Sequence, residues 1–180
     1  MSPDLTGNAA YPRPRIVVIG VTGCGKTTVG KNLAKRLNLD FGDADDFHSK
    51  ANIEKMAGGT PLTDEDRWPW LESIGQWLES HDDGAVAGCS ALRVVYRDRI
   101  RAHCPDTYFV HLDGPMDVAV RRVAKRKGHF MPAKLVQSQY DTLEALTDDE
   151  SGVVISFDQP VEAIVEKALR AIASLREASS

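Results

Sequence analysis

Gly20-Val21-Thr22-Gly23-Cys24-Gly25-Lys26-Thr27 is the stretch that decides the fold, because it matches the pattern G-x-x-x-x-G-K-[ST] at every fixed position. The β-branched residues Ile16 to Ile19 stand directly before it, and apolar residues recur at helical spacing after it, at Val29, Leu33 and Leu37. A buried strand, a glycine-rich turn and a helix in this order make a phosphate-binding loop, whose main-chain N–H groups and helix dipole hold a polyphosphate. A chance match would not bring the strand and the helix with it.

The residue types in this loop each have a chemical reason. Lys26 can reach the β- and γ-phosphates of a nucleoside triphosphate, and the Thr27 hydroxyl can ligate Mg²⁺. Cys24 is interpreted as a small filler of the loop rather than a nucleophile, because no histidine lies nearby in the sequence to activate it. The predicted nucleotide-binding residues of this segment are Gly20, Val21, Thr22, Gly23, Cys24, Gly25, Lys26, Thr27 and Thr28.

Strands and helices are predicted to alternate along the rest of the chain. Further short strands are expected at 39–41, 85–89, 107–112 and 153–157, and helices at 52–57, from Thr63 onward, at 93–103, 116–126 and 133–144, and from Pro160. This alternation predicts an α/β fold: a three-layer P-loop NTPase with a five-stranded parallel sheet and helices on both faces. It forms a single domain over residues 15–178. Residues 1–14 are small, polar and proline-bearing, which predicts a flexible leader.

Composition limits the possible functions. The 180-residue chain is 42% hydrophobic and 27% charged, which is typical of a soluble globular protein. A net charge of −4 argues against general affinity for nucleic acid. Three cysteines are too few for a disulfide framework or a zinc site, and no run of about 18 apolar residues occurs. We therefore expect a cytoplasmic protein with neither a nucleic-acid nor a membrane partner.

Motifs elsewhere in the sequence indicate which class of P-loop protein this is. The sequence lacks the Asn-Lys-x-Asp motif of a switch GTPase, and Ser90-Ala91-Leu92 stands where an ATPase motor usually carries an acidic metal-binding residue. The chain is short and carries a basic segment late in its sequence. This combination favours a small kinase that closes over two substrates and excludes water.

The basic segment predicts a mobile lid over about residues 122–134. Arg122 and Arg126 are four residues apart and share a helix face, and Gly128 offers a place to bend. The two guanidinium groups could cover the triphosphate and stabilise charge during transfer. A solvated helix face and a nucleic-acid patch are the alternatives. The basic residues are Arg121, Arg122, Lys125, Arg126 and Lys127.

Several longer motifs resemble those of the bacterial-type gluconokinases, over about residues 15–175. They are Asp43 to His48, Asn52 to Met56, Pro61 to Leu71, Cys89 to Arg93 with Tyr96-Arg97, Arg126 to Phe130, and Ser138-Gln139. The resemblance implies ATP, Mg²⁺ and D-gluconate, which would give 6-phosphogluconate and ADP, and it implies a homodimer as one option. Arg93 stands where a lysine is usual, and Asp46 adds a carboxylate to the acidic turn.

Two aspartates just past the second strand are the candidates for the reacting end of the site. Asp43 and Asp45 are two residues apart and point the same way if the strand geometry persists. The resemblance implies that Asp45 orients or deprotonates the terminal hydroxyl of the sugar acid, while Asp43 supports Mg²⁺ together with Thr27. Lys26, Asp45, Arg122 and Arg126 form the predicted catalytic set. The alternative is an acidic turn that only caps the next helix.

Gluconate carries one carboxylate and a row of hydroxyls, so its pocket should combine basic, amide and imidazole groups. The candidates for the carboxylate are Arg67, Arg93 and Arg97, and those for the hydroxyls are Asp45, His48, Asn52, Lys55 and Ser90. Gln159 and Pro160, in the turn after the last strand, are placed beside adenine by analogy. Asp64 and Asp66 are interpreted as first-turn acids of a helix.

Two other readings compete with gluconate phosphorylation. One is another small kinase of the same architecture, such as shikimate or adenylylsulfate kinase. The other is a nucleotide-binding regulator without catalysis, against which the intact Lys26, Thr27 and Asp45 argue.

Overall fold

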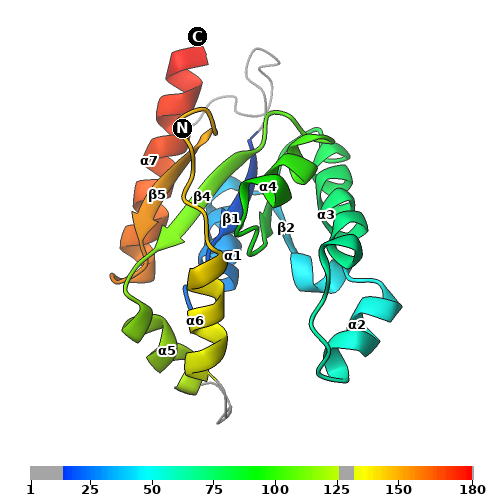
Figure 1. The fold of residues 1–180 in the computed structure, drawn as a ribbon. Coiled ribbons are helices and arrows are strands. Elements are labelled where there is room, and N and C mark those ends of the chain that lie inside the picture. The colour runs from blue at the N-terminus through cyan, green and yellow to red at the C-terminus, as the bar shows by residue number, and fades with distance from the viewer. Residues whose placement is uncertain (1–13, 126–131, 180) are drawn as a thin grey trace.

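The computed structural model describes residues 14–125 and 132–179, and in them strands and helices alternate as predicted (Figure 1). Arg126, most of the predicted leader and the middle of the predicted lid lie outside these residues. The elements are β1 Arg15–Ile19, α1 Lys26–Leu37, β2 Asp40–Asp43, the 3-10 turn η1 Ala44–Phe47, α2 Lys50–Ala57, α3 Asp64–Glu79, β3 Ala85–Gly88, α4 Val94–Arg101, β4 Tyr108–Asp113, α5 Met116–Lys125, α6 Pro132–Thr142, β5 Gly152–Ser156 and α7 Val161–Ser179.

The strands of the described residues form one five-stranded, all-parallel sheet in the order β2-β3-β1-β4-β5. This confirms the predicted fold class. The glycine-rich loop leaves the central strand, and the register pairs Val18 with Gly88 and Gly88 with Asp43. The carboxyl ends of β1, β3 and β2 therefore meet at one edge of the sheet, where open α/β folds bind their ligands.

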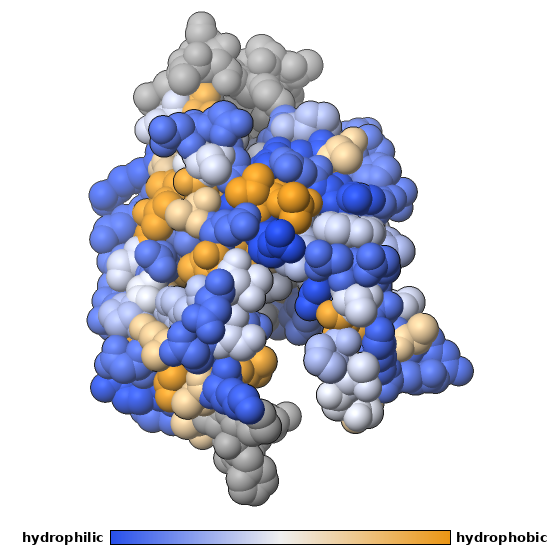
Figure 2. All heavy atoms as spheres, in the orientation of Figure 1, coloured by the Kyte–Doolittle hydropathy of each residue, from blue (hydrophilic) through white to orange (hydrophobic). Residues whose placement is uncertain are grey.

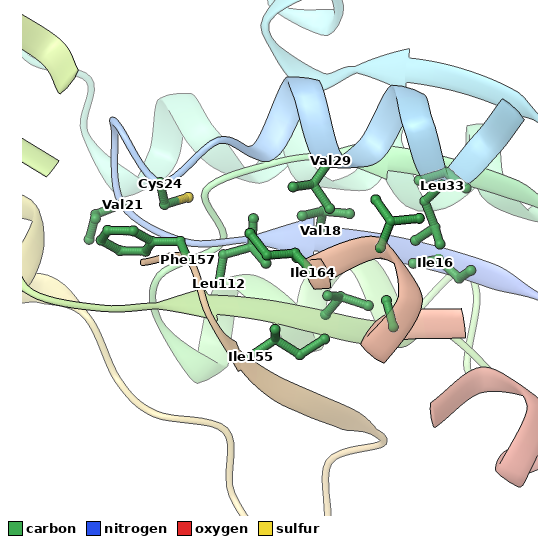
Figure 3. Packing of buried hydrophobic residues seen from close by; sticks show 14 of the residues in the cluster. Ile16, Val18, Val21, Cys24, Val29, Leu33, Leu112, Ile155, Phe157 and Ile164 are labelled. Carbon is green, nitrogen blue, oxygen red and sulfur yellow. The ribbon is translucent and has the colours of Figure 1, made fainter. Parts of the chain in front are cut away.

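Two hydrophobic cores lie on opposite faces of the sheet, because successive side chains of a strand point to opposite sides. In β1, Ile16 and Val18 enter one core, and Val17 and Ile19 enter the other. The first core packs the sheet against α1 and α7, as Figure 3 shows for Val29, Leu33 and Ile164 around Val18 and Leu112. The second packs it against α3 and α4. Burial on both faces explains why β1 is a continuous apolar run.

Helix α3 begins with the predicted capping box: the Thr63 hydroxyl accepts from Asp66 N, and the Asp66 carboxylate accepts from Thr63 N. Its residues Trp70, Leu71, Ile74 and Leu78 are buried as expected, while Trp77 is only partly buried against the same core. Among the described residues, no helix has the length and apolar character needed to cross a membrane.

The structure shifts some predicted boundaries. The second strand is Asp40–Asp43 rather than 39–41, so Gly42 and Asp43 belong to the strand and not to a turn. A Cβ at Gly42 would lie 2.9 Å from the Trp77 ring, so this glycine lets α3 approach the sheet closely. Pro14, the last residue of the predicted leader, accepts a hydrogen bond from Ala85 N.

Candidate active site

The glycine-rich loop requires glycine for conformational reasons. Gly23 and Gly25 have φ angles of 86° and 95°, in the left-handed region, and a Cβ at Gly23 would lie 2.7 Å from the Ala119 carbonyl oxygen. Gly25 is the N-cap of α1 and no side chain caps that helix. The first N–H groups of α1 are therefore available to an anion in front of the loop.

Lys26 folds over this loop: its Nζ donates to the carbonyl oxygens of Gly20 and Val21, at 3.0 and 3.1 Å. Cys24 is buried beneath it, and burial raises the pKa of its thiol although the charge of Lys26 lowers it. A buried, protonated thiol agrees with the interpretation of Cys24 as a filler.

A cavity of about 220 Å³ lies in front of the loop, at the carboxyl ends of β1, β2 and β3. Figure 2 shows the surface hollowed here, between the side formed by α5 and α6 and the side formed by α2 and α3. The structure thus brings the predicted phosphate and acceptor groups to one space. Its lining residues are Thr22, Gly23, Gly25, Lys26, Thr27, Asp43, Asp45, Gly88, Cys89, Ser90 and Gln139.

Asp43 both caps a turn and meets the loop. One carboxylate oxygen accepts from Asp45 N at 3.0 Å, which caps η1, so the alternative of a capping acid describes part of its role. The other oxygen accepts from the Thr27 hydroxyl at 3.4 Å. A hydroxyl and a carboxylate side by side on a cavity wall fit Mg²⁺, which takes one or two such ligands and completes its shell with phosphate and water.

Asp45 projects into the same cavity with an altered acidity. Asp45 as a whole is exposed, but its position against the cavity wall partly buries the carboxyl group and raises its pKa. The neighbouring charge of Asp43 raises the pKa further, whereas His48 and Lys26 lower it. Perturbed acids in clefts are candidates for proton transfer. Among the described residues, no hydrogen bond ties down the Asp45 side chain, which leaves the carboxylate free to accept one from a ligand.

His48, Asn52 and Lys55 lie outside the lining of the cavity, and Asp66 links them, because Asn52 Nδ2 donates to Asp66 O at 3.0 Å. His48 stacks on Trp70, with ring centroids 4.2 Å apart, and its Nδ1 lies 3.3 Å from Asn52 Nδ2. Burial lowers the pKa of His48, so its ring is neutral near pH 7. Lys55 Nζ donates to the Asp66 carboxylate at 2.6 Å, and this bond leads the interactions that lower the Asp66 pKa to about 2.

Two of the arginines predicted to bind the substrate carboxylate, Arg67 and Arg93, both bind the side chain of Asp64. Asp64 accepts from the Tyr96 hydroxyl at 2.7 Å, from Arg67 at 3.0 Å and from Arg93 at 3.3 Å. The Tyr96 bond, followed by the arginines, lowers the pKa of Asp64. Asp64 is thus more than a first-turn acid: it holds both guanidinium groups in place.

The structure corrects the prediction that Arg97 binds a substrate carboxylate. Arg97 is fully buried, and its guanidinium pairs with Glu150 at 2.7 Å and donates to the carbonyl oxygens of Ala91, Glu144 and Ala145. Each of its three guanidinium nitrogens bonds to a protein oxygen, and Arg97 is not one of the residues that line the cavity. Its place on α4 faces the core rather than the cleft.

Arg122 lies between the loop and the turn that follows β5. It donates to the Phe157 carbonyl oxygen at 2.9 Å and, at 3.4 Å, to that of Gly23, and its guanidinium lies 5.1 Å from the centroid of the Phe157 ring. Gln159 is bonded to Ser156 O and to Lys167, and neither Gln159 nor Pro160 lines the cavity.

Sequence reasoning missed Gln139 as a site residue. Its Oε1 accepts from Thr22 N at 2.6 Å, and its side chain lines the cavity. Its only signal in the sequence was the short motif Ser138-Gln139, since 117 residues separate it from its partner in the loop. Tyr96 was missed in the same way.

The chain is similar to a set of named proteins over most of its length. The profile of a family described as shikimate kinase matches residues 22–173. The gluconokinase of Gluconobacter oxydans is 43% identical over 88% of this chain and 91% of its own. The thermosensitive gluconokinase of Escherichia coli is 37% identical over 89% of this chain and 88% of its own. A gluconokinase of Arabidopsis thaliana is 41% identical over 95% of each chain.

Solved structures agree with these relatives. A gluconokinase from Sinorhizobium meliloti superposes with a TM-score of 0.84 at 43% identity and covers 93% of this chain and 95% of its own. The APS kinase CysC of Mycobacterium tuberculosis superposes at 0.68 with 16% identity, over 90% and 99%. At that identity the second likeness shows the fold alone.

Proposed function

The chain belongs to the gluconokinase family, and on that premise we infer that it transfers the γ-phosphoryl group of ATP to D-gluconate, giving 6-phosphogluconate and ADP. The observation that carries the mechanism is that Lys26 and Asp45 line one cavity. Phosphoryl transfer needs cations on the phosphates and an acceptor for the proton of the attacking alcohol, and these two residues supply both.

We propose that Asp45 takes the proton of the terminal hydroxyl of gluconate. The hydroxyl oxygen forms a bond to the γ-phosphorus as the bond from that phosphorus to the bridging oxygen of ADP breaks, and the proton passes to the carboxylate. Burial and Asp43 raise the pKa of Asp45, which makes it a stronger base than an ordinary aspartate.

The glycine-rich loop and Lys26 would hold the phosphates. Arg122, which bonds to Gly23 O at 3.4 Å, keeps its predicted role of stabilising charge on the phosphates as a prediction. Thr27 and Asp43 would hold Mg²⁺, which when bound supplies positive charge to the β- and γ-phosphates. The predicted role of Arg126 stays a prediction, as does that of Gln159 and Pro160 at adenine.

Arg67 and Arg93 are the proposed partners of the gluconate carboxylate. Asp64 binds both arginines, Arg67 also donates to the Tyr96 hydroxyl, and Arg93 Nε lies 3.8 Å from Glu144 Oε2. These contacts fix the position of each guanidinium group and so orient its remaining donors. His48, Asn52 and Ser90 are the proposed partners of the hydroxyls. Lys55 is engaged with Asp66, so its contribution would be to position Asp66 and, through it, the start of α3.

The test is a coupled ADP-release assay with gluconate, other sugar acids, shikimate and adenylylsulfate as acceptors. Gluconate-dependent turnover is expected, and Asp45→Asn should lower kcat by about 10²- to 10⁴-fold, the range for loss of a general base. Asp46→Asn, next in the chain and likewise exposed but outside the lining of the cavity, is the matched control. Turnover of shikimate or adenylylsulfate in place of gluconate would assign the chain to a different small kinase.

ATP binding without turnover of any of these acceptors would count against the kinase assignment and favour the alternative of a non-catalytic regulator. We further propose a cytoplasmic location, whose reducing conditions suit the free Cys24, Cys89 and Cys104. A homodimer, and the lack of a nucleic-acid partner, remain predictions that sedimentation and gel-shift measurements would test.

A further inference from the structure

We propose that Gln139 contacts the acceptor substrate: with its Oε1 fixed on the phosphate-binding loop, its Nε2 donates to an oxygen of the sugar acid in the cavity. The inference rests on the proposed function, and it adds a specificity-determining residue to it. One side-chain amide would then join the acceptor to the loop that holds the transferred phosphate.

The orientation of this amide is set by its partner. Thr22 N is a main-chain N–H group and can only donate, so the Gln139 atom 2.6 Å from it is the oxygen. The nitrogen, with two hydrogens, must point the other way. The usual ambiguity between the two ends of a glutamine side chain does not arise here.

The donor end of Gln139 has no protein acceptor among residues 14–125 and 132–179, where the bond to Thr22 is its single side-chain hydrogen bond. The side chain is half-buried and lines the cavity that Lys26, Asp45 and Ser90 also line. An amide with one end fixed and two donors left over, in a cavity with a proposed proton acceptor, is suited to a ligand rich in oxygen.

Helix α6 is held firmly enough to give this amide a defined place. Tyr140, the next residue, donates from its hydroxyl to Gly114 O at 2.6 Å, and Val136 is fully buried in the first core. Just after the helix, Glu144 N donates to Leu92 O at 2.7 Å. A preorganised donor costs less to order on binding than a free side chain does.

The chemistry of the amide favours the acceptor over the nucleotide. Lys26 and the uncapped start of α1 already supply charge and donors for phosphates. The N–H of Thr22 is used by Gln139, so this edge of the loop is turned toward α6. A neutral amide gives little charge to a triphosphate, but it matches the hydroxyls of a sugar acid in polarity and geometry.

The experiment compares Gln139→Met, which keeps the length but removes both ends of the amide, with Gln139→Glu, which keeps an oxygen for Thr22 N and removes the donors. The matched control is Gln137→Met, an exposed position on the same helix whose amide bonds to Asp141. For each variant, kcat and KM are measured for gluconate and for ATP, and the Kd of a non-hydrolysable ATP analogue is measured without acceptor.

Both Gln139 variants should raise the KM for gluconate by about tenfold or more, the size expected for one hydrogen bond to a polar ligand. The KM for ATP and the Kd of the analogue should change by less than about threefold, and Gln137→Met should behave as the wild type. If one variant fails to fold, as judged by thermal melting, the KM values of the other variant still test the proposal.

Two results would overturn the inference. An unchanged KM for gluconate in both variants would show that Gln139 does not touch the acceptor. Equal losses for ATP, its analogue and gluconate would assign the residue to the loop alone. If the wild type showed no gluconate-dependent turnover, it is the proposed function that would fail, and this outcome is separable because it involves no variant.

Discussion

Burial and the charge of Asp43 raise the pKa of the Asp45 carboxyl group, although Lys26 shares the cavity with it. A carboxylate in such a place is harder to ionise than one in water, so its ionisation lowers the stability of the folded protein. The chemistry benefits from the same shift, because a stronger base accepts the proton of an alcohol more readily. Acidity and stability are therefore coupled at this one residue.

We predict that Asp45→Asn raises the melting temperature at pH 7 while it abolishes most activity. The folded-state pKa lies above the unfolded one, so stability falls as pH rises through the unfolded pKa and stays lower above the folded pKa. An amide cannot ionise and avoids this loss, and among the described residues no hydrogen bond of the Asp45 side chain is broken. A melting temperature below that of the wild type, in calorimetry at pH 7, would contradict the assignment.

At the scale of elements, α4 and the segment between α6 and β5 are joined by a buried ion-pair network. Glu150 accepts from Arg97 at 2.7 Å, from Arg101 at 2.7 Å and from Thr147 N at 3.0 Å. Arg97 also donates to the carbonyl oxygen of Ala91, a residue with φ of 38° next to Ser90 on the cavity wall. The network thus holds a strained loop at the site without touching a ligand.

Glu150→Gln should lower the free energy of unfolding by about 3–5 kcal/mol, because it leaves buried arginine charge uncompensated. Burial raises the pKa of Glu150, but the bonds from Arg97, Thr147 N and Arg101 outweigh it and hold the pKa at about 2. Its stabilisation is present above the unfolded pKa, near 4.5, and is lost as pH falls toward 2. In urea titrations, the stabilities of wild type and variant should therefore approach each other as pH falls from 4.5 and converge near pH 2.

Glu72→Gln is the control for this network, since the Glu72–Arg99 pair lies on the surface with more than a third of each side chain exposed. Such pairs contribute about 0–1 kcal/mol. If both glutamate variants lost stability equally, the buried network would not have the role assigned to it.

For the whole molecule, the phosphate-binding loop leaves the central strand between the two hydrophobic cores. An anion bound there would contact the loop between β1 and α1, and Arg122 bonds both to this loop and to Phe157, at the start of the turn after β5. Binding at this position should stabilise the entire domain rather than one part of it, because a small single domain unfolds cooperatively.

A non-hydrolysable ATP analogue at 100 times its Kd, with Mg²⁺, should stabilise the fold by about 2.7 kcal/mol. For a domain of this size this corresponds to a rise of about 5–10 °C in melting temperature. Lys26→Met should remove most of the rise, and Lys31→Met, on the exposed face of the same helix, should keep it. An equal rise in the two variants would place the nucleotide elsewhere.

Much of the architecture was predictable because its causes are local. The glycine pattern with its flanking strand and helix, the Thr63–Asp66 capping box and the alternation of apolar segments each depend on residues a few positions apart. They led to the five-stranded sheet and to the meeting of Lys26, Thr27, Asp43 and Asp45 in one cavity. Strand ends were less certain, since Gly42 and Asp43 belong to β2 through their pairing with Ala87 and Gly88 of β3.

The sequence by itself determined the fold class, the phosphate-binding loop and the acidic residues facing it, because spacing within a strand, turn or helix decides these. Tertiary structure alone decided which partners the long polar side chains bind. Arg97 turned to Glu150, 53 residues away, Tyr96 to Asp64, 32 away, and Gln139 to Thr22, 117 away. An arginine or a glutamine has no preferred partner in the sequence, and the packing of the elements determines whether its donors meet a ligand or the protein's own oxygens.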